Sequence, residues 1–170
     1  MDITQLILDD HHEQRRLFAL LDQVDPADVT ALDAIWSQLG DFLEVHAKAE
    51  EMHFYPALLQ RGQGAGEKSD ANAETLDAIK DHNEIRDAIA KVGGHAPGSA
   101  EWLQAVTSAR KANSDHMGEE ERQALADFRR HAPLQVRHDL GVLFAGFEAR
   151  HRMGVQAEDK DPKTYIKQHG

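Results

Sequence analysis

One short pattern of histidine and glutamate occurs twice in the chain, once in each half. A lone histidine is followed, 35 residues later in the first half and 34 in the second, by a histidine and a glutamate four positions apart. The residues are His11, His46 and Glu50 in the first half, and His82, His116 and Glu120 in the second. Side chains four apart on an α-helix lie on the same face. A helical fold with two equivalent halves would therefore direct all six side chains toward one place.

Helical periodicity runs through most of the chain. Apolar residues recur at spacings of three and four, with little of the alternation that is typical of strands. Breaks rich in glycine or proline separate the periodic stretches, and Asp28 and Ser99 stand where N-caps are expected. The pattern predicts helices over residues 3–23, 29–61, 68–92, 99–131 and 134–152. The remaining residues, 154–170, are polar, and we expect them to be loosely held.

The connections between these helices indicate how they pack. Short connections between long helices make sequential neighbours antiparallel. At about 1.5 Å of rise per residue, the four histidines of the pattern can then lie near one level. We predict an all-α fold, an up-down-up-down four-helix bundle with an additional C-terminal helix and a short polar tail. Residues 1–153 would form the one domain and residues 154–170 the tail.

The composition excludes several classes of protein. The formal net charge is −11 at pH 7, so the phosphates of a nucleic acid would repel the chain. The 170 residues include no cysteine, which excludes disulfides and thiolate metal sites. No stretch approaches the roughly 20 apolar residues of a membrane span, and the N-terminus lacks the features of a signal peptide. We therefore expect a cytoplasmic protein that binds neither nucleic acid nor membrane.

The residues around the repeated pattern indicate that it points into the bundle. Leu39 and Leu43 share a helix face with His46, as Ile79 and Ile85 do with His82. Buried imidazoles and carboxylates without partners are costly, and two metal ions would supply the compensating charge. This mixture of ligands suits iron, zinc, copper, nickel or manganese better than calcium or magnesium. Six protein ligands cannot saturate two octahedral ions, so positions remain open for a small ligand.

A simpler interpretation exists for each half of the pattern taken alone. A single histidine and glutamate four apart is usually a surface pair, and a lone histidine on an apolar face is usually a hydrogen-bonded core residue. A structural bundle with incidental histidines is therefore an alternative. The repetition of the complete set at nearly equal spacing favours the two-metal interpretation.

The motifs that surround the six residues repeat as well. Asp10-His11-His12-Glu13 corresponds to Asp81-His82-Asn83-Glu84, and His46-x3-Glu50-Glu51, followed by Phe54-Tyr55-Pro56, corresponds to His116-x3-Glu120-Glu121. With these motifs the chain resembles the hemerythrin-like, or HHE cation-binding, domain family over residues 3–131.

The resemblance implies a four-helix bundle around a non-heme di-iron centre, with two iron ions in an oxo- or hydroxo-bridged arrangement. His11 and His46 would bind one iron, His82 and His116 the other, and Glu50 and Glu120 would be the bridging carboxylates. Zinc or manganese could occupy the same ligands. Beyond these metal ligands, we expect no catalytic residue and no further cofactor site.

The chain departs from the oxygen-carrying hemerythrins at the second iron. Those proteins have another histidine where this chain has Arg86, and an aspartate five residues after the last histidine, where this chain has Glu120 at four. The more open site favours a protein that reacts with small oxidants, hydrogen peroxide or O2, with catalase-like activity and a role in oxidative stress. The alternative is a non-enzymatic module that binds or senses O2, nitric oxide (NO) or iron. The sequence leaves protein partners open.

Two arginines stand four residues after the lone histidines, where the other two helices carry the glutamate. We predict that Arg15 and Arg86 pair with Glu51 or Glu121 at the rim and so orient the ligand carboxylates. The alternative is an arginine that extends along the surface into solvent.

Two residues that follow Glu50 are predicted to lie off the site. On a continuous helix Tyr55 points about 180° away from His46, which predicts packing between helices. His53 lies closer to the His46 face, but the second half has Gln123 in the corresponding place. We therefore expect His53 to be a hydrogen-bonded rim residue rather than a ligand.

Overall fold

The regular structure of this protein is helical. The computed structural model describes residues 1–65 and 70–170, which confirms the all-α fold class for these ranges. The elements in order are α1 (Ile3–Leu21), α2 (Val29–Ala49), the π-helical turn η1 (Glu50–Phe54), α3 (Tyr55–Arg61), α4 (Ala71–Gly93), α5 (Ala100–Arg122), α6 (Ala124–His131), α7 (Leu134–Arg150) and α8 (Pro162–His169). None of the helices in the described ranges combines the length and the hydrophobicity that a membrane span requires.

Helix starts follow the capping signals in the sequence. The Asp28 carboxylate accepts a hydrogen bond from the amide of Ala31 at 3.0 Å. The Ser99 hydroxyl accepts one from the amide of Trp102 at 3.1 Å. Both predicted N-caps are thus confirmed, since each satisfies an amide that the helix itself leaves without a partner. The predicted start of the third helix, at residue 68, lies outside the described residues.

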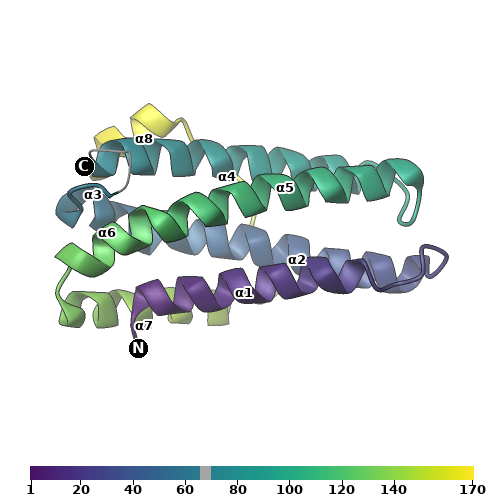
Figure 1. Ribbon diagram of the computed structural model, residues 1–170, viewed down its shortest axis with the longest axis horizontal. Coiled ribbons are helices and arrows are strands. Elements are labelled where there is room, and N and C mark those ends of the chain that lie inside the picture. The colour runs from purple at the N-terminus through teal and green to yellow at the C-terminus, as the bar shows by residue number, and fades with distance from the viewer. Residues whose placement is uncertain (66–69) are drawn as a thin grey trace.

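The four longest helices lie alongside one another. Figure 1 shows α1, α2, α4 and α5 with their long axes running in nearly the same direction. Helix α1 packs against α2 and α5, and α4 packs against α5 and α2. The connections 22–28 and 94–99 lie at one end of this group, whereas α3 and α6 lie at the other (Figure 1). Helix α7 packs along α1 and α2.

Two of the predicted helices are interrupted shortly after their glutamate, so their prediction as continuous helices was wrong. The helix expected over 29–61 widens at η1, where the amide of Tyr55 donates to the carbonyl of Glu50, five residues earlier. Pro56 follows this turn. It has no N–H to donate, and in an ordinary α-helix its ring clashes with the carbonyl four residues earlier. A π turn accommodates one additional residue at this point. The helix expected over 99–131 breaks at Gln123, where φ is −113° and ψ is −83°.

The apolar core of residues 1–65 and 70–170 consists of two clusters, and the repeated pattern lies between them. Along α1, Ile3 and Ile7 belong to the first cluster and Leu17 and Leu21 to the second, with His11 between. The large aromatic side chains of the first cluster are Phe54, Tyr55, Phe128, Phe144, Phe147 and Tyr165, and those of the second are Phe18, Trp36 and Trp102. Apolar packing on both sides therefore encloses a polar layer in the middle of the helices.

The C-terminal residues are packed onto the rest of the chain, so the expectation of a loosely held tail was wrong. Residues 162–169 form α8, which packs against α4 and α3. Tyr165 is buried, and its hydroxyl donates to the backbone carbonyl of Glu51 at 2.5 Å. The predominantly polar sequence concealed this docking, because one buried tyrosine and a few polar contacts provide it.

Candidate metal centre

The structure brings together the six side chains of the repeated pattern. His11 comes from α1, His46 from α2, His82 from α4, and His116 and Glu120 from α5, while Glu50 begins the π turn. None of the six is more than 4 % exposed. They form two groups, His11–His46–Glu50 and Glu50–His82–His116. In each group the ligand atoms are close enough to share a metal ion.

Glu50 lies between the two groups and belongs to both. Its Oε1 is 3.1 Å from Nε2 of His46, and its Oε2 is 3.2 Å from Nε2 of His82. The Nε2 atoms of His82 and His116 are 3.2 Å apart. One carboxylate thus presents an oxygen to a histidine of each half, as a carboxylate that bridges two ions would.

Glu120 has a different environment from Glu50. Its Oε2 is 3.3 Å from Nε2 of His11, and its Oε1 accepts a hydrogen bond from the Tyr55 hydroxyl at 2.6 Å. Glu120 therefore faces the His11 side of the centre, and a tyrosine holds its second oxygen.

Several of the inward-facing atoms have no hydrogen-bond partner although they are fully buried. They are Nε2 of His11, Nε2 of His46, both carboxylate oxygens of Glu50 and Oε2 of Glu120. Buried polar atoms are almost always satisfied, because leaving them without a partner costs free energy. Imidazole nitrogens and carboxylate oxygens together suit transition metals. The residues present fit two metal ions, which together would satisfy these atoms.

Each of the four histidines has a carboxylate on its other ring nitrogen. We call these four the outer carboxylates: Asp10 lies 2.9 Å from Nδ1 of His46, Glu51 3.0 Å from that of His82, Asp81 3.3 Å from that of His116, and Glu121 3.0 Å from that of His11. A carboxylate there fixes the orientation of the ring and directs Nε2 inward. Sequence reasoning did not assign these roles. The available signal was an acid directly before each lone histidine and directly after each glutamate, in both halves.

The predicted pairing of the two arginines is confirmed, but Arg86 and Glu51 are buried rather than at the rim, and what the arginines support differs from the prediction. A guanidinium nitrogen of Arg15 lies 2.7 Å from Oε1 of Glu121, and one of Arg86 lies 2.6 Å from Oε1 of Glu51. These carboxylates contact the imidazoles of His11 and His82. The arginines therefore support histidines of the centre rather than Glu50 and Glu120.

Protons balance the buried carboxylates in this arrangement. Burial lowers the pKa of the His82 imidazole, but contacts with Glu50 and Glu51 outweigh burial and raise that pKa to about 9. Burial raises the pKa of Glu51, but contacts with His82 and Arg86 outweigh it and lower the pKa to about 2. Because metal ligation requires a neutral imidazole, a bound cation would replace such protons.

Tyr55 faces the centre, so its predicted position away from the His46 face was wrong. Its side chain is fully buried, its ring centroid is 5.7 Å from that of His82, and its hydroxyl reaches Glu120. Burial and the charge of Glu120 raise its pKa well above the usual value. The prediction assumed about 100° of rotation per residue, whereas the π turn advances less per residue and turns Tyr55 inward.

His53 lies in the π turn and belongs to neither of the two groups. Its ring packs edge-on against Phe147 of α7, with the centroids 6.0 Å apart. Its Nε2 is buried without a hydrogen-bond partner, unlike the hydrogen-bonded rim residue that was expected. Burial and the charge of Arg150 lower its pKa.

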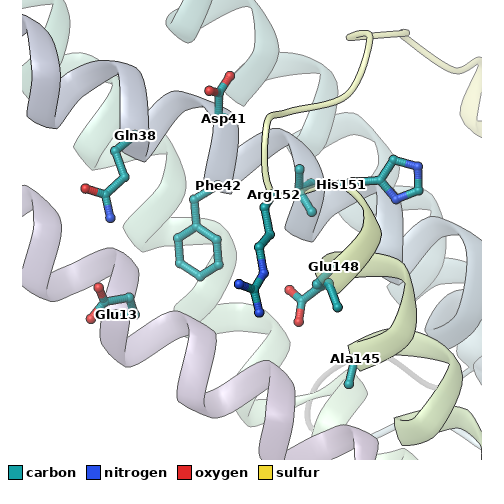
Figure 2. A pocket seen from close by; sticks show the side chains of 10 residues that line it. Glu13, Gln38, Asp41, Phe42, Ala145, Glu148, His151 and Arg152 are labelled. Atoms are coloured by element: carbon teal, nitrogen blue, oxygen red, sulfur yellow. The ribbon is translucent and has the colours of Figure 1, made fainter.

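A cavity of about 440 Å³ lies beside the first half of the centre, and it was not predicted. Figure 2 shows Glu148 and Arg152 extending from α7 and the residues after it toward Phe42 of α2. Glu148 forms a further close group with Asp10 and His46, and burial together with Asp10 raises its pKa to about 8. The cavity thus borders Glu148, which lies close to Asp10, the outer carboxylate of His46.

Comparison with known proteins agrees with the geometry. The family model described as hemerythrin HHE cation-binding domain matches residues 2–127. Searches of curated proteins and of solved structures returned no significant match. The matched range contains all six inward-facing residues and ends before α7 and α8. The chain therefore belongs to the hemerythrin HHE cation-binding domain family.

Proposed function

We propose that this protein holds two iron ions and that the resulting centre reacts with small oxidants, hydrogen peroxide or O2. The ligands would be His11, His46, Glu50, His82, His116 and Glu120, in the up-down-up-down bundle of the family. The observation that carries the proposal is the position of Glu50, whose two buried oxygens face one histidine of each half without a hydrogen-bond partner. Zinc or manganese would fit the same ligands.

The four histidines divide into two pairs. His11 and His46 would bind one ion and His82 and His116 the other, with Glu50 between them. The outer carboxylates keep the Nδ1 side of each ring occupied, so that Nε2 is available for ligation. Tyr55 holds one oxygen of Glu120 and leaves the other facing His11.

The surroundings of the centre favour reactions of very small molecules. Bound iron would supply redox chemistry, exchanging electrons with the oxidant. The chain encloses the six side chains between two apolar clusters, which limits access to ligands the size of peroxide, O2 or NO. Six protein ligands leave positions open on two octahedral ions, and such a ligand could bind there.

The first test is metal content and peroxide turnover of protein purified without a histidine tag. We expect about two iron ions per chain and the release of one O2 for every two hydrogen peroxide molecules consumed, measured with an oxygen electrode. The His12→Ala variant, which changes an exposed histidine beside His11, should retain both properties. Fewer than about one metal ion per chain would overturn the proposal. Two iron ions without oxygen release, but with reversible O2 or NO binding, would support the non-enzymatic alternative.

Replacing Tyr55 with phenylalanine should weaken metal binding while the fold is retained. The variant leaves Oε1 of Glu120 buried without its donor, and loss of such a supporting hydrogen bond typically costs about 10- to 100-fold in metal affinity. Competition with a chelator would measure the change. Thr107→Val, which removes an exposed hydroxyl bonded to the backbone carbonyl of Leu103, is a control for loss of a side-chain hydroxyl. An unchanged affinity in Tyr55→Phe would show that Tyr55 does not position Glu120.

A further inference from the structure

In the part of the chain that the structure describes, the C-terminal segment contacts the residues that support the His82 half of the centre. The ammonium of Lys160 forms an ion pair with Oε2 of Glu51, the outer carboxylate of His82. Glu51 also accepts from Arg86, and its side chain is 0 % exposed. Three cationic or proton-donating groups thus surround one fully buried carboxylate.

Glu121, the equivalent outer carboxylate in the other half, is more exposed than Glu51. Within residues 1–65 and 70–170, the Glu121 carboxylate pairs with His11 and Arg15, and its side chain is 28 % exposed. The repeated pattern is therefore symmetric in its inner residues but not in the groups that support them.

A departure from the repeat explains why the segment docks on this half. Asn83 stands where the first half has the exposed His12. Its side-chain amide donates to the carbonyl of Lys160 at 2.8 Å, and its carbonyl oxygen accepts from the amide of Lys160 at 3.1 Å. This reciprocal pair fixes the backbone of Lys160 directly beside His82.

The π turn supplies the second attachment point. The carbonyl of Glu51 would accept from the residue five positions later in a π turn, but that residue is Pro56, which has no N–H. The Tyr165 hydroxyl donates to this carbonyl at 2.5 Å. The segment therefore satisfies a buried acceptor that the helix itself cannot satisfy.

We infer that Lys160 is a positioning residue that acts through Glu51 on His82 and makes the two metal positions unequal. This inference rests on the proposed two-metal centre. Lys160 holds the buried carboxylate in the orientation that directs the His82 ring inward. The position formed by His82 and His116 therefore depends on the C-terminal segment, and the position formed by His11 and His46 does not.

The test measures Zn²⁺ affinity by chelator competition in full-length variants that retain one position each. His11→Ala retains the His82 position, and His116→Ala retains the His11 position. Adding Lys160→Met, which keeps the length of the side chain but removes its charge, should weaken Zn²⁺ binding about 10-fold or more in His11→Ala. The same change should have less than about a 2-fold effect in His116→Ala. Lys160→Arg should restore the affinity, and Lys163→Ala, at an exposed position of the same segment, should have no effect.

Each failure has a separate meaning. Equal effects of Lys160→Met on both positions, or no effect on either, would overturn the role of Lys160 while the metal centre stands. An absence of Zn²⁺ binding in the wild-type chain would overturn the centre and the inference together. Circular dichroism identifies any variant that fails to fold, and Asn83→Ala then provides a second way to release Lys160, with the same selective loss expected.

Discussion

The Glu50→Gln variant is expected to retain less than about half a metal ion per chain, where the wild-type chain retains about two. Glu50 belongs to both groups that could hold an ion, and its two oxygens face His46 and His82. The substitution preserves the shape of the side chain but removes its negative charge, so both positions lose a ligand at once. Metal analysis after gel filtration would measure the content.

The matched control for Glu50→Gln is the loss of a histidine that belongs to one group only. His116→Ala should retain about one ion, because His11, His46 and Glu50 are unchanged. If Glu50→Gln and His116→Ala lost the same amount of metal, the central position of Glu50 would have no functional meaning. Two retained ions in Glu50→Gln would contradict the proposed ligand set.

The Phe54→Ala variant should lower the free energy of unfolding by about 3–5 kcal/mol, the usual cost of removing a buried phenylalanine. Phe54 lies at the end of the π turn with 0 % exposure, and its ring packs against Tyr55 and Phe128 at centroid distances of 5.2 and 5.4 Å. Denaturant unfolding of the metal-free protein, followed by circular dichroism, would measure the loss without a contribution from bound metal.

Met52 offers a control within the same turn. It is 48 % exposed, so Met52→Ala should change the free energy of unfolding by no more than about 0.5 kcal/mol. Similar effects of Met52→Ala and Phe54→Ala would show that the turn does not direct Phe54 into the core.

Helical periodicity predicted most of the fold, because apolar residues at spacings of three and four identify helices over long stretches. The starts at Asp28 and Ser99 were predictable because capping depends on adjacent residues. The break at Gln123 and the turn at residues 50–54 were not, since amphipathic spacing continues through both. The docking of α8 was also hidden, because it depends on Tyr165 meeting a carbonyl more than a hundred residues away.

The sequence by itself determined which six side chains could converge, since a duplicated histidine and glutamate pattern on amphipathic helices has one inward face per helix. Only the tertiary structure decided how these side chains are supported. The contacts of Asp10 with His46 and of Glu51 with His82 join different helices, so their pairing depends on how the helices pack. Tyr55 and Lys160 reach the centre because a π turn and a docked C-terminal segment place them there. Periodicity within one helix carries no information about the π turn or about the docking of the C-terminal segment.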